Sequence, residues 1–391
     1  MKLLEFIDLL RMIYGKKDLD LSRVQQMGLL AIKIGQVHAL RLDFLPVEKC
    51  RELAKLYRKN DDIPAEHVLE KLDRSMFDTI DEEPLASASV GQVHTGTIDG
   101  KKVAIKIVKQ DFKQKFIKDV NSVRRFVKFA LFFYPKLKSV FDPIGILEHI
   151  EEYTLKEIDL CEEINGQKTL RKIYDQNKDG FDLDALRFPE IYIDISTSDV
   201  MVSEFVEGET FDELLEKDEL DYEQLLELFH VHGFYLFRIG TFHGDIHPGN
   251  IILNNGKMYF VDTGAISTAS KRLSGGLLDF FDALSLFDYK ECAACLNKMA
   301  EKRIDGERYK KFERDFIELY KDFTDSTVGE VSLTMKMMET IRLGVLSGMR
   351  FEKGMFPIIK SLMFLDGMVL RCNPDAKLLL DMRRYIDELR D

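Results

Sequence analysis

The sequence predicts an α+β protein in which a small strand-containing part precedes a large, mostly helical part. Residues 91–108 form two runs of strand-forming residues joined by the Asp-Gly of residues 99–100, a strong hairpin signal. From Phe211 onward, helical periodicity dominates, and one further hairpin, around the Asn-Asn-Gly of residues 254–256, interrupts it. Because 391 residues exceed what one core usually organises, we expect two compact units.

A helical extension precedes the strand-containing part. Its first helix is predicted to be amphipathic, because one face carries Leu3, Phe6, Ile7, Leu10 and Tyr14. Charged residues interrupt this segment, so we do not expect a secretory signal peptide. The longest apolar run, residues 129–134, is far shorter than the roughly 20 residues that cross a bilayer. We divide the chain into a helical extension (residues 1–60), a strand-containing part (61–208) and a helical part (209–391).

The composition narrows the class of function. Lys and Arg number 56 against 68 Asp and Glu, so the formal charge is −12 and a nucleic-acid partner is not expected. The 5 cysteines are scattered, which does not suggest a disulfide framework and favours a reducing compartment. Cys292 and Cys295 form a lone CxxC pattern. We interpret them as two small buried helix residues rather than a redox pair or half a zinc site.

Two carboxylates and a carboxamide follow one another with the spacing of a phosphoryl-transfer site. Residues 243–250 read HGDIHPGN, so Asp245 and Asn250 are five positions apart, and Asp262 follows the next predicted strand. Protein kinases use an Asp-x4-Asn loop and a later Asp-x-Gly for the acceptor and the metal. We expect Asp245 to orient or deprotonate an acceptor or a water, and Asn250 and Asp262 to hold Mg²⁺. His243 is expected to stabilise the loop.

A strand lysine and a hinge-like segment are two further sequence elements typical of a kinase active site. Residues 103–106 read VAIK on the second strand of the first hairpin, so Lys106 is expected to reach the α- and β-phosphates of a nucleotide. Residues 201–209 resemble a kinase hinge, where backbone groups of Glu204 and Val206 would hydrogen-bond adenine. The order of these elements predicts a protein-kinase-like bilobal fold with an N-terminal helical extension.

The catalytic motif also resembles the motifs of other enzyme classes. Residues 262–265 read DTGA, an aspartic-protease signature, but a protease needs a second such carboxylate and the sequence has no second DTG. His243 and His247 resemble a zinc pair, but the glycines and the proline of the segment forbid a regular helix. Small-molecule kinases of the aminoglycoside/choline type remain an alternative, because HGDxHPGN fits their catalytic loop.

Three further features distinguish the sequence from an ordinary kinase. Residues 33–36 read KIGQ, where Lys33 and Gln36 share a helix face and Gly35 lets another surface approach closely. The segment in the place of a glycine-rich phosphate loop consists of small residues, namely Ala86, Ser87, Ala88, Ser89, Val90 and Gly91. A predicted helix carries three acids, namely Glu157, Asp159 and Glu163.

Together these motifs resemble the UbiB/AarF family of atypical kinases, whose marks are a KxGQ extension, an Ala-rich loop, an ExD helix and an HxDxHPGN loop. The resemblance runs from about Lys33 to Gly264. It implies a kinase-like fold in which the KxGQ segment folds over the active site, where a protein substrate would bind. Ser87 and Ser89 stand where the family has alanines more uniformly.

The resemblance also implies roles for the family-specific residues. Lys33 and Gln36 are expected to enter the site, with Glu157 and Asp159 as their acidic partners. Glu163 is expected to pair with the strand lysine. Which acid takes which lysine is left open by the sequence.

The function implied by the resemblance is an ATPase or atypical kinase that binds ATP or ADP with Mg²⁺. It would support ubiquinone or other isoprenoid-lipid metabolism, with lipids or enzymes of that pathway as partners. The expected location is the cytoplasm, peripherally on the inner face of the cell membrane. A small-molecule kinase of the aminoglycoside/choline type and a non-catalytic nucleotide-binding scaffold stay open as alternatives.

A basic, aromatic stretch offers a membrane-binding surface. Residues 109–138 hold nine Lys or Arg against two Asp, and phenylalanines are interleaved with them. An amphipathic helix of this composition can lie on an anionic membrane surface. The alternative is an ordinary helix with a charged outer face and a phenylalanine core.

Overall fold

The computed structural model describes residues 1–15, 19–39, 45–57, 72–87, 91–108, 112–133, 143–352 and 354–390. These residues form two compact units. The first unit comprises Met1–Asn165 and Pro189–Phe205, and the second comprises Gly166–Phe188 and Val206–Asp391. The predicted α+β class is confirmed. The predicted division at residues 60 and 208 stays a prediction, although one unit boundary falls close to residue 208.

The first unit contains a five-stranded sheet with the order β1-β3-β4-β6 and β2 paired to β3. The strands are β1 (Thr79–Ile80), β2 (Ala86–Ser87), β3 (Gly91–Ile98), β4 (Lys101–Val108) and β6 (Val200–Glu204). The predicted hairpin is confirmed, because β3 and β4 pair antiparallel and the turn residues Asp99 and Gly100 have φ of 50° and 71°. Alternation along β4 buries Val103, Ile105 and Ile107 on one face.

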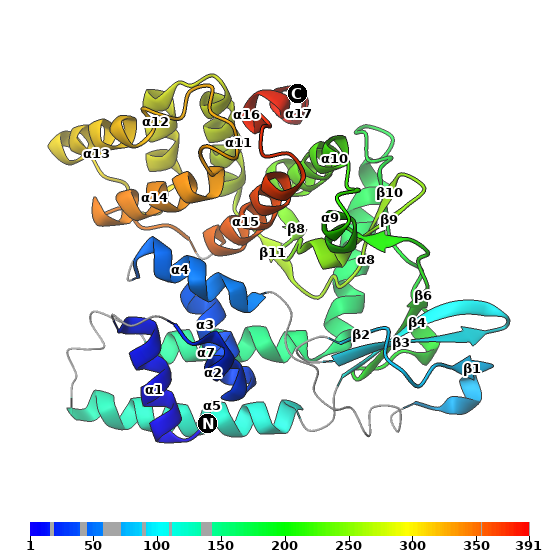
Figure 1. Cartoon of the computed structure of the whole chain (residues 1–391). Coiled ribbons are helices and arrows are strands. Elements are labelled where there is room, and N and C mark those ends of the chain that lie inside the picture. Colours follow the sequence, from blue (N-terminus) through cyan, green and yellow to red (C-terminus); the bar gives the residue numbers. More distant parts are fainter. Residues whose placement is uncertain are drawn as a thin grey trace. The chain divides into compact units, whose positions relative to one another are not determined.

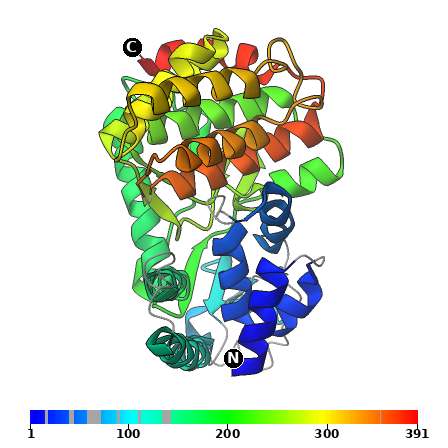
Figure 2. The same cartoon turned by 90° about the vertical axis from the view of Figure 1, so that its left-hand side faces the viewer.

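Helices make up the rest of the first unit (Figure 1). They are α1 (Leu3–Tyr14), α2 (Leu21–Gln26), α3 (Leu29–Ala39), α4 (Val47–Ala54), α5 (Phe112–Phe133), α7 (Pro143–Glu157) and the start of α8 (Leu160–Asn177), with short 3₁₀ turns η1 (Lys55–Tyr57), η3 (Arg74–Met76) and η4 (Ile193–Ile195). Helices α5 and α7 lie side by side and are seen nearly end-on in Figure 2.

The second unit contains two small sheets. One has the order β5-β10-β9-β7, formed by β5 (Leu186–Arg187), β10 (Lys257–Phe260), β9 (Ile251–Asn254) and β7 (Glu209–Thr210). The other pairs β8 (Thr241–His243) with β11 (Ile266–Thr268). The predicted second hairpin is confirmed as β9 and β10, with Asn255 and Gly256 in the turn at φ of 48° and 73°.

The helices of the second unit are α9 (Phe211–Glu216), α10 (Tyr222–Gly233), the π-helical turn η5 (Phe234–Ile239), the 3₁₀ turn η6 (Pro248–Asn250), α11 (Lys271–Ser285), α12 (Tyr289–Met299), α13 (Gly306–Leu319), α14 (Leu333–Leu346), α15 (Met355–Cys372), α16 (Leu378–Asp381) and α17 (Arg383–Arg390). Aromatic side chains fill the space between several of them; Phe280, Phe312, Phe316 and Tyr320 are fully buried. In the described parts of the chain, no helix has the length and apolar character needed to cross a membrane.

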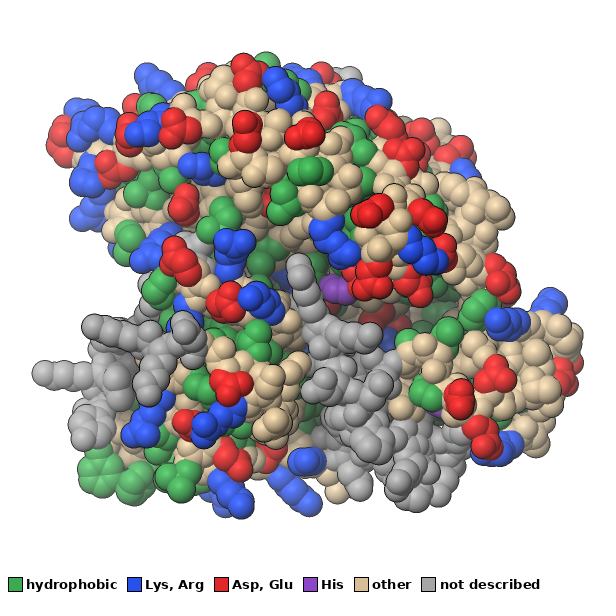
Figure 3. Space-filling view, in the orientation of Figure 1, with side chains coloured by type: hydrophobic (Ala, Val, Ile, Leu, Met, Phe, Trp, Pro, Cys, Tyr) green, Lys and Arg blue, Asp and Glu red, His purple; other side chains and the backbone are tan. Residues whose placement is uncertain are grey.

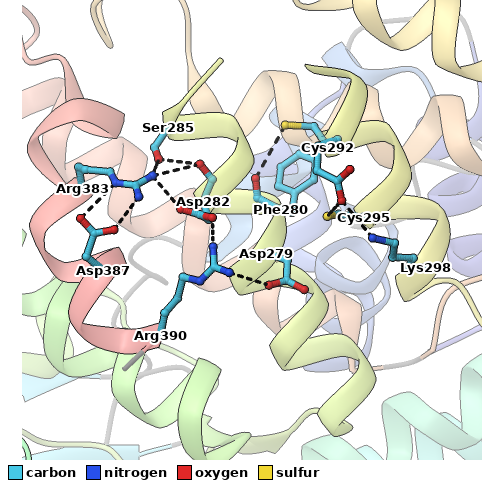
Figure 4. Close-up of polar contacts among 11 residues, drawn as sticks. Asp279, Phe280, Asp282, Ser285, Cys292, Cys295, Lys298, Arg383, Asp387 and Arg390 are labelled. Carbon is cyan, nitrogen blue, oxygen red and sulfur yellow. Dashed lines mark hydrogen bonds and ion pairs between the residues drawn. The ribbon is translucent and has the colours of Figure 1, made fainter. Parts of the chain in front are cut away.

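Ion pairs tie the last helix of the second unit to α11 (Figure 4). Asp282 Oδ1 lies 2.7 Å from Arg383 Nη1, and the same carboxylate also forms an ion pair with Arg390. Arg383 binds Asp387 at 2.6 Å within α17 as well. The carboxylate of Asp282 is therefore shared by two guanidinium groups, a charge-assisted arrangement that fixes the end of the chain described here.

The CxxC cysteines lie in the same view, on α12 (Figure 4). The thiol of Cys292 donates to the Phe280 carbonyl at 3.8 Å, and that of Cys295 to the Glu291 carboxylate at 3.5 Å. Burial raises the pKa of both thiols, that of Cys295 to about 12. Since the thiolate is the reactive and metal-binding form, this environment favours two inert helix residues, as the sequence indicated.

Candidate active site

In the first unit, Lys106 and Glu163 form an ion pair. Strand β4 directs Lys106 away from the face that buries Val103 and Ile105, and α8 supplies Glu163. Lys106 Nζ lies 2.6 Å from Glu163 Oε2, and the two side chains are only 14% and 7% exposed. The pairing implied by the resemblance is therefore present in the structure. An acid that holds the lysine in place is what a phosphate-binding strand lysine requires.

A second buried lysine of the first unit pairs with a different acid. Lys33 on α3 forms an ion pair with Glu157, the last residue of α7, and its side chain is 6% exposed. Its ammonium also lies 5.9 Å from the ring centroid of Tyr153. The structure thus assigns Glu157 to Lys33 and leaves Glu163 to the strand lysine, which the sequence had left open.

The other residues of the KIGQ segment bind within the helical extension. Gln36 Nε2 donates to the Leu56 carbonyl at 2.9 Å. A Cβ at Gly35 would lie 2.4 Å from Leu56 Cδ1, so a larger residue here would require the Leu56 side chain of η1 to shift. The expectation that Gly35 admits a neighbouring surface is confirmed, and that surface belongs to the extension itself. Entry of Lys33 and Gln36 into a nucleotide site stays a prediction.

The three acids were expected on one helix, and this expectation is wrong, whereas the role of Asp159 as an acidic partner of Lys33 and Gln36 stays a prediction. The chain leaves the helix between Glu157 and Leu160, so residues 157–163 do not lie on one continuous helix. Asp159 Oδ1 instead accepts from the Cys161 N–H at 3.1 Å at the start of α8. An aspartate before a helix is stabilised there because it satisfies backbone donors that the helix leaves unpaired.

The small-residue loop is partly described. Ala86 and Ser87 form β2 and pair with Val93 and Gln92 of β3. Ala88, Ser89 and Val90 lie outside the described residues. Gly91 begins β3, and a Cβ there would lie 2.7 Å from the Ile107 carbonyl oxygen, so glycine is required by the neighbouring strand. The role of residues 86–91 in binding phosphates stays a prediction.

The hinge-like segment begins at the end of β6. The Glu204 N–H donates to the Glu190 carbonyl at 2.7 Å, so this backbone donor is already used within the first unit. Val206 belongs to the second unit and is 7% exposed. Adenine recognition by Glu204 and Val206 stays a prediction.

In the second unit, the HGDIHPGN segment runs from β8 through η6 into β9. Asn250 Nδ2 donates to the Asp245 carbonyl at 3.0 Å, which leaves the Asn250 Oδ1 for a cation. The Val261 N–H donates to the Asn250 carbonyl at 3.0 Å and brings the end of β10 beside the loop. Asp245, Asn250 and Asp262 are thus held on one connected stretch of backbone.

The two histidines of this segment support the loop. His243 Nδ1 accepts from the Asp245 N–H at 3.2 Å, and His247 Nδ1 accepts from the Gly249 N–H at 3.0 Å. Burial lowers the pKa of His243, although the carboxylates of Asp245 and Asp262 act in the opposite direction. Because both Nδ1 atoms receive backbone donors, the histidines position the loop, and the interpretation as a zinc pair loses its basis.

Asp262 adopts a left-handed backbone, with φ of 56°. Aspartate tolerates this region better than most residues, and such strained positions cluster at functional sites. The following residue, Thr263, is buried, and a Cβ at Gly166 of α8 would lie 2.1 Å from its carbonyl oxygen. Close packing by α8 therefore fixes the backbone on which the Asp262 carboxylate is presented.

The donor set fits Mg²⁺. Asn250 offers a carboxamide oxygen and Asp262 a carboxylate, which are the hard oxygen ligands that Mg²⁺ prefers. The described residues contain no group of three or more His, Cys, Asp and Glu that would hold a metal by itself. Mg²⁺ commonly takes one or two protein oxygens and completes its shell with water and phosphate, so two ligands suffice.

Sequence reasoning missed one charged neighbour of the catalytic loop. Lys360 on α15 places its Nζ 2.9 Å from Asp245 Oδ2, and its side chain is 9% exposed. No motif marks this lysine. The available signal was a single cation within the apolar run of residues 355–364, MFPIIKSLMF, because a lysine on a buried helix face needs an acidic partner.

Comparisons with known proteins agree with these motifs. Residues 59–296 match the ABC1 atypical kinase-like domain. A "Probable protein kinase UbiB" of Aliivibrio fischeri is 24% identical over 392 residues, covering 93% of this chain and 69% of the relative. The Arabidopsis thaliana protein "ACTIVITY OF BC1 COMPLEX KINASE 8, chloroplastic" is 28% identical over 274 residues, covering 66% of this chain and 35% of the relative.

One solved structure shows the same fold. It is the Rv3197 protein of Mycobacterium tuberculosis in complex with erythromycin, with a TM-score of 0.55 and 20% sequence identity. The match covers 91% of this chain and 90% of the solved one. A similarity at this level of identity extends to the fold and not to the ligand.

Proposed function

The chain belongs to the ABC1 atypical kinase-like family, and from this premise we propose that it binds a Mg-nucleotide, ATP or ADP, and acts as an atypical kinase or ATPase. The observation that carries the proposal is the arrangement in the second unit. Asp245, Asn250 and Asp262 are held on one hydrogen-bonded backbone segment, with the Asn250 amide oriented so that its oxygen remains for a cation.

Each unit contributes groups of the kind that phosphoryl transfer needs. Lys106, fixed by Glu163, would neutralise the α- and β-phosphates, while Asn250 and Asp262 would hold Mg²⁺. The metal, when bound, neutralises charge on the phosphate oxygens. Asp245 would orient the acceptor hydroxyl or a water and receive its proton. Catalysis of this kind rests on positioning and electrostatic stabilisation rather than on a covalent intermediate.

We place this activity in ubiquinone or other isoprenoid-lipid metabolism at a membrane. Relatives named as UbiB kinases support the assignment, as does the KIGQ segment in which Lys33 is held by Glu157. An aminoglycoside/choline-type kinase is the second candidate, because the HGDxHPGN loop alone fits it equally well. A scaffold that binds nucleotide without turnover is the third.

Helix α5 supplies a surface suited to membrane contact. Its buried face carries Phe116, Val120, Val123 and Val127, so these side chains belong to the core of the first unit. Phe129, Phe132 and Phe133 are instead 68%, 80% and 58% exposed. These three residues lie at the C-terminal end of α5, and Figure 3 shows a patch of hydrophobic side chains at its lower left. Large exposed aromatic clusters mark interaction sites.

The substitution Asp262→Asn tests the nucleotide proposal. For the wild-type protein, Mg-ATP at a hundred times its Kd is expected to stabilise the fold by about 2.7 kcal/mol. Removing the carboxylate charge should abolish the Mg²⁺-dependent part of this stabilisation, measured as the shift in thermal unfolding with ATP in Mg²⁺ against EDTA. Asp218→Asn is the matched control, since Asp218 is an exposed aspartate of the same unit with φ of 57°. An unchanged Mg-ATP shift in Asp262→Asn would refute the metal assignment.

A further inference from the structure

Two side chains of helix α15 contact the catalytic loop. Lys360 Nζ lies 2.9 Å from Asp245 Oδ2, and the ring of Phe364 packs edge-on against His247 with centroids 5.2 Å apart. Lys360 and Phe364 are four residues apart and therefore share one face of the helix. Lys360 Nζ also lies 5.8 Å from the Phe364 ring centroid, so the two side chains form one contact surface.

The two oxygens of Asp245 have different surroundings. Oδ2 is held by Lys360, whereas Oδ1 is buried and has no hydrogen-bond partner among the described residues. A buried carboxylate oxygen without a donor costs free energy that a hydroxyl donor from a ligand would recover. The ion pair thus fixes which oxygen is left for an acceptor.

We propose that Lys360 is a positioning residue for phosphoryl transfer, an inference that rests on the proposed function. It holds Asp245 by Oδ2 and directs Oδ1 to the acceptor. In the transfer, the acceptor oxygen bonds to the γ-phosphorus and the bond from phosphorus to the β,γ-bridging oxygen breaks. ADP leaves with that electron pair, and the acceptor proton passes to Oδ1.

A purely structural role explains Lys360 less well. Replacing a buried ion pair by apolar residues of similar volume is often neutral or stabilising, so packing alone gives no reason for a charge at this place. Helix α15 also lies beyond residues 59–296, the part matched by the kinase-like domain. The matched domain contains Asp245 and the catalytic loop but not Lys360. The C-terminal region of this chain would therefore supply the cation that positions Asp245.

The test compares Mg-ATP hydrolysis by the wild-type protein, Lys360→Met and Lys360→Arg. Lys360→Met should lower kcat by about 10²-fold, a typical contribution of a positioned general base, with KM for ATP within about threefold. Lys360→Arg keeps the cation and should retain kcat within about tenfold of wild type. Arg371→Met is the matched control, because Arg371 also extends from α15 to an acid, Asp212 at 3.1 Å, away from the loop.

A double-mutant cycle shows whether Lys360 acts through Asp245. The kcat of Asp245→Asn/Lys360→Met should equal that of Asp245→Asn, since residues that act as a unit are not additive. If the losses in kcat multiply in the double variant, or if Lys360→Met keeps the wild-type kcat, the positioning role is overturned. The proposed function is unaffected by either outcome. Absence of Mg-ATP binding by the wild-type protein would overturn the proposed function and this inference with it. Thermal unfolding is measured for each variant, and Lys360→Gln replaces Lys360→Met if the latter does not fold.

Discussion

Lys33 and Glu157 are charged groups that are largely removed from solvent, with side chains 6% and 22% exposed. The intact pair contributes little net free energy to folding, but removal of one partner is strongly destabilising. Removing one partner leaves an uncompensated charge in a poorly solvated place, whereas removing both leaves none. The pair therefore offers a way to separate the fold of the helical extension from any effect of Lys33 on nucleotide turnover.

We expect Lys33→Met to destabilise the protein by about 1–3 kcal/mol, and the double variant Lys33→Met/Glu157→Gln to recover part of that loss. Urea unfolding monitored on the first unit gives the comparison. Lys156→Met is the control, because Lys156 pairs with Glu152 on the same helix but both side chains are more than half exposed. Its effect should stay within about 0.5 kcal/mol. Additive losses in the double variant would contradict a coupled pair.

Single residues also show what sequence patterns can specify. The motif spacing predicted a set of candidate site residues, and the structure places Asp245, Asn250 and Asp262 on one connected segment. The partner of each lysine could not be predicted, because side chains that are distant in the sequence meet only through packing. Lys360 belongs to this class, since its partner lies on a loop more than a hundred residues earlier.

Helix α14 begins against a carboxylate from another helix. Asp366 of α15 accepts from the Ser332 hydroxyl at 2.6 Å and from the N–H groups of Leu333 and Thr334, both at 3.2 Å. It is 5% exposed. The first turn of a helix leaves its N–H groups without intrahelical partners, and a negative charge there also complements the helix dipole.

Asp366→Ala should cost about 2 kcal/mol, at the upper end of the range for a lost helix cap, because three donors lose a buried acceptor. Hydrogen exchange of the amides of residues 333–336 should accelerate, whereas exchange in α12 should not. In the control Asp288→Ala, an exposed cap of α12 is lost and about 1 kcal/mol is expected. Equal costs for both variants would argue against the special position of Asp366.

At the level of elements, turn chemistry was the most informative signal. Asp99-Gly100 and Asn255-Gly256 predicted the two hairpins because both turns need positive φ, which these residues tolerate. The break between α7 and α8 was not predicted. Residues 157–160 contain no glycine or proline that would mark the end of a helix. Asp159 marks the start of α8 through its hydrogen bond from the Cys161 N–H, and this contact is visible only in the structure.

The charge of the whole chain and the charge of α5 have opposite signs. The chain has a formal charge of −12, yet residues 112–133 contain six Lys or Arg and one Asp. Lys115, Lys118, Arg125 and Lys128 are exposed on this helix. The exposed phenylalanines follow at its C-terminal end. This combination of a cationic face with aromatic anchors is suited to an anionic lipid surface, because apolar burial and electrostatic attraction act together.

Vesicle flotation tests the membrane proposal in the full chain. Binding to vesicles with anionic phosphatidylserine should weaken as salt rises, because surface charges are screened over about 10 Å at 0.1 M ionic strength. Replacing Lys115, Lys118, Arg125 and Lys128 by Gln should lower binding to anionic vesicles strongly, since each nearby cation contributes about 1 kcal/mol.

The apolar part of the same surface gives an independent arm of the experiment. Replacing Phe129, Phe132 and Phe133 by Ser should reduce flotation at every salt concentration, because the aromatic anchors do not depend on charge. The control replaces Ile317, Leu286 and Leu346 by Ser, which are 40%, 61% and 70% exposed in the second unit. If the control and the phenylalanine variant lose binding equally, α5 is not the contact. If the wild-type protein floats equally with neutral vesicles, recognition of anionic lipid by this helix is refuted.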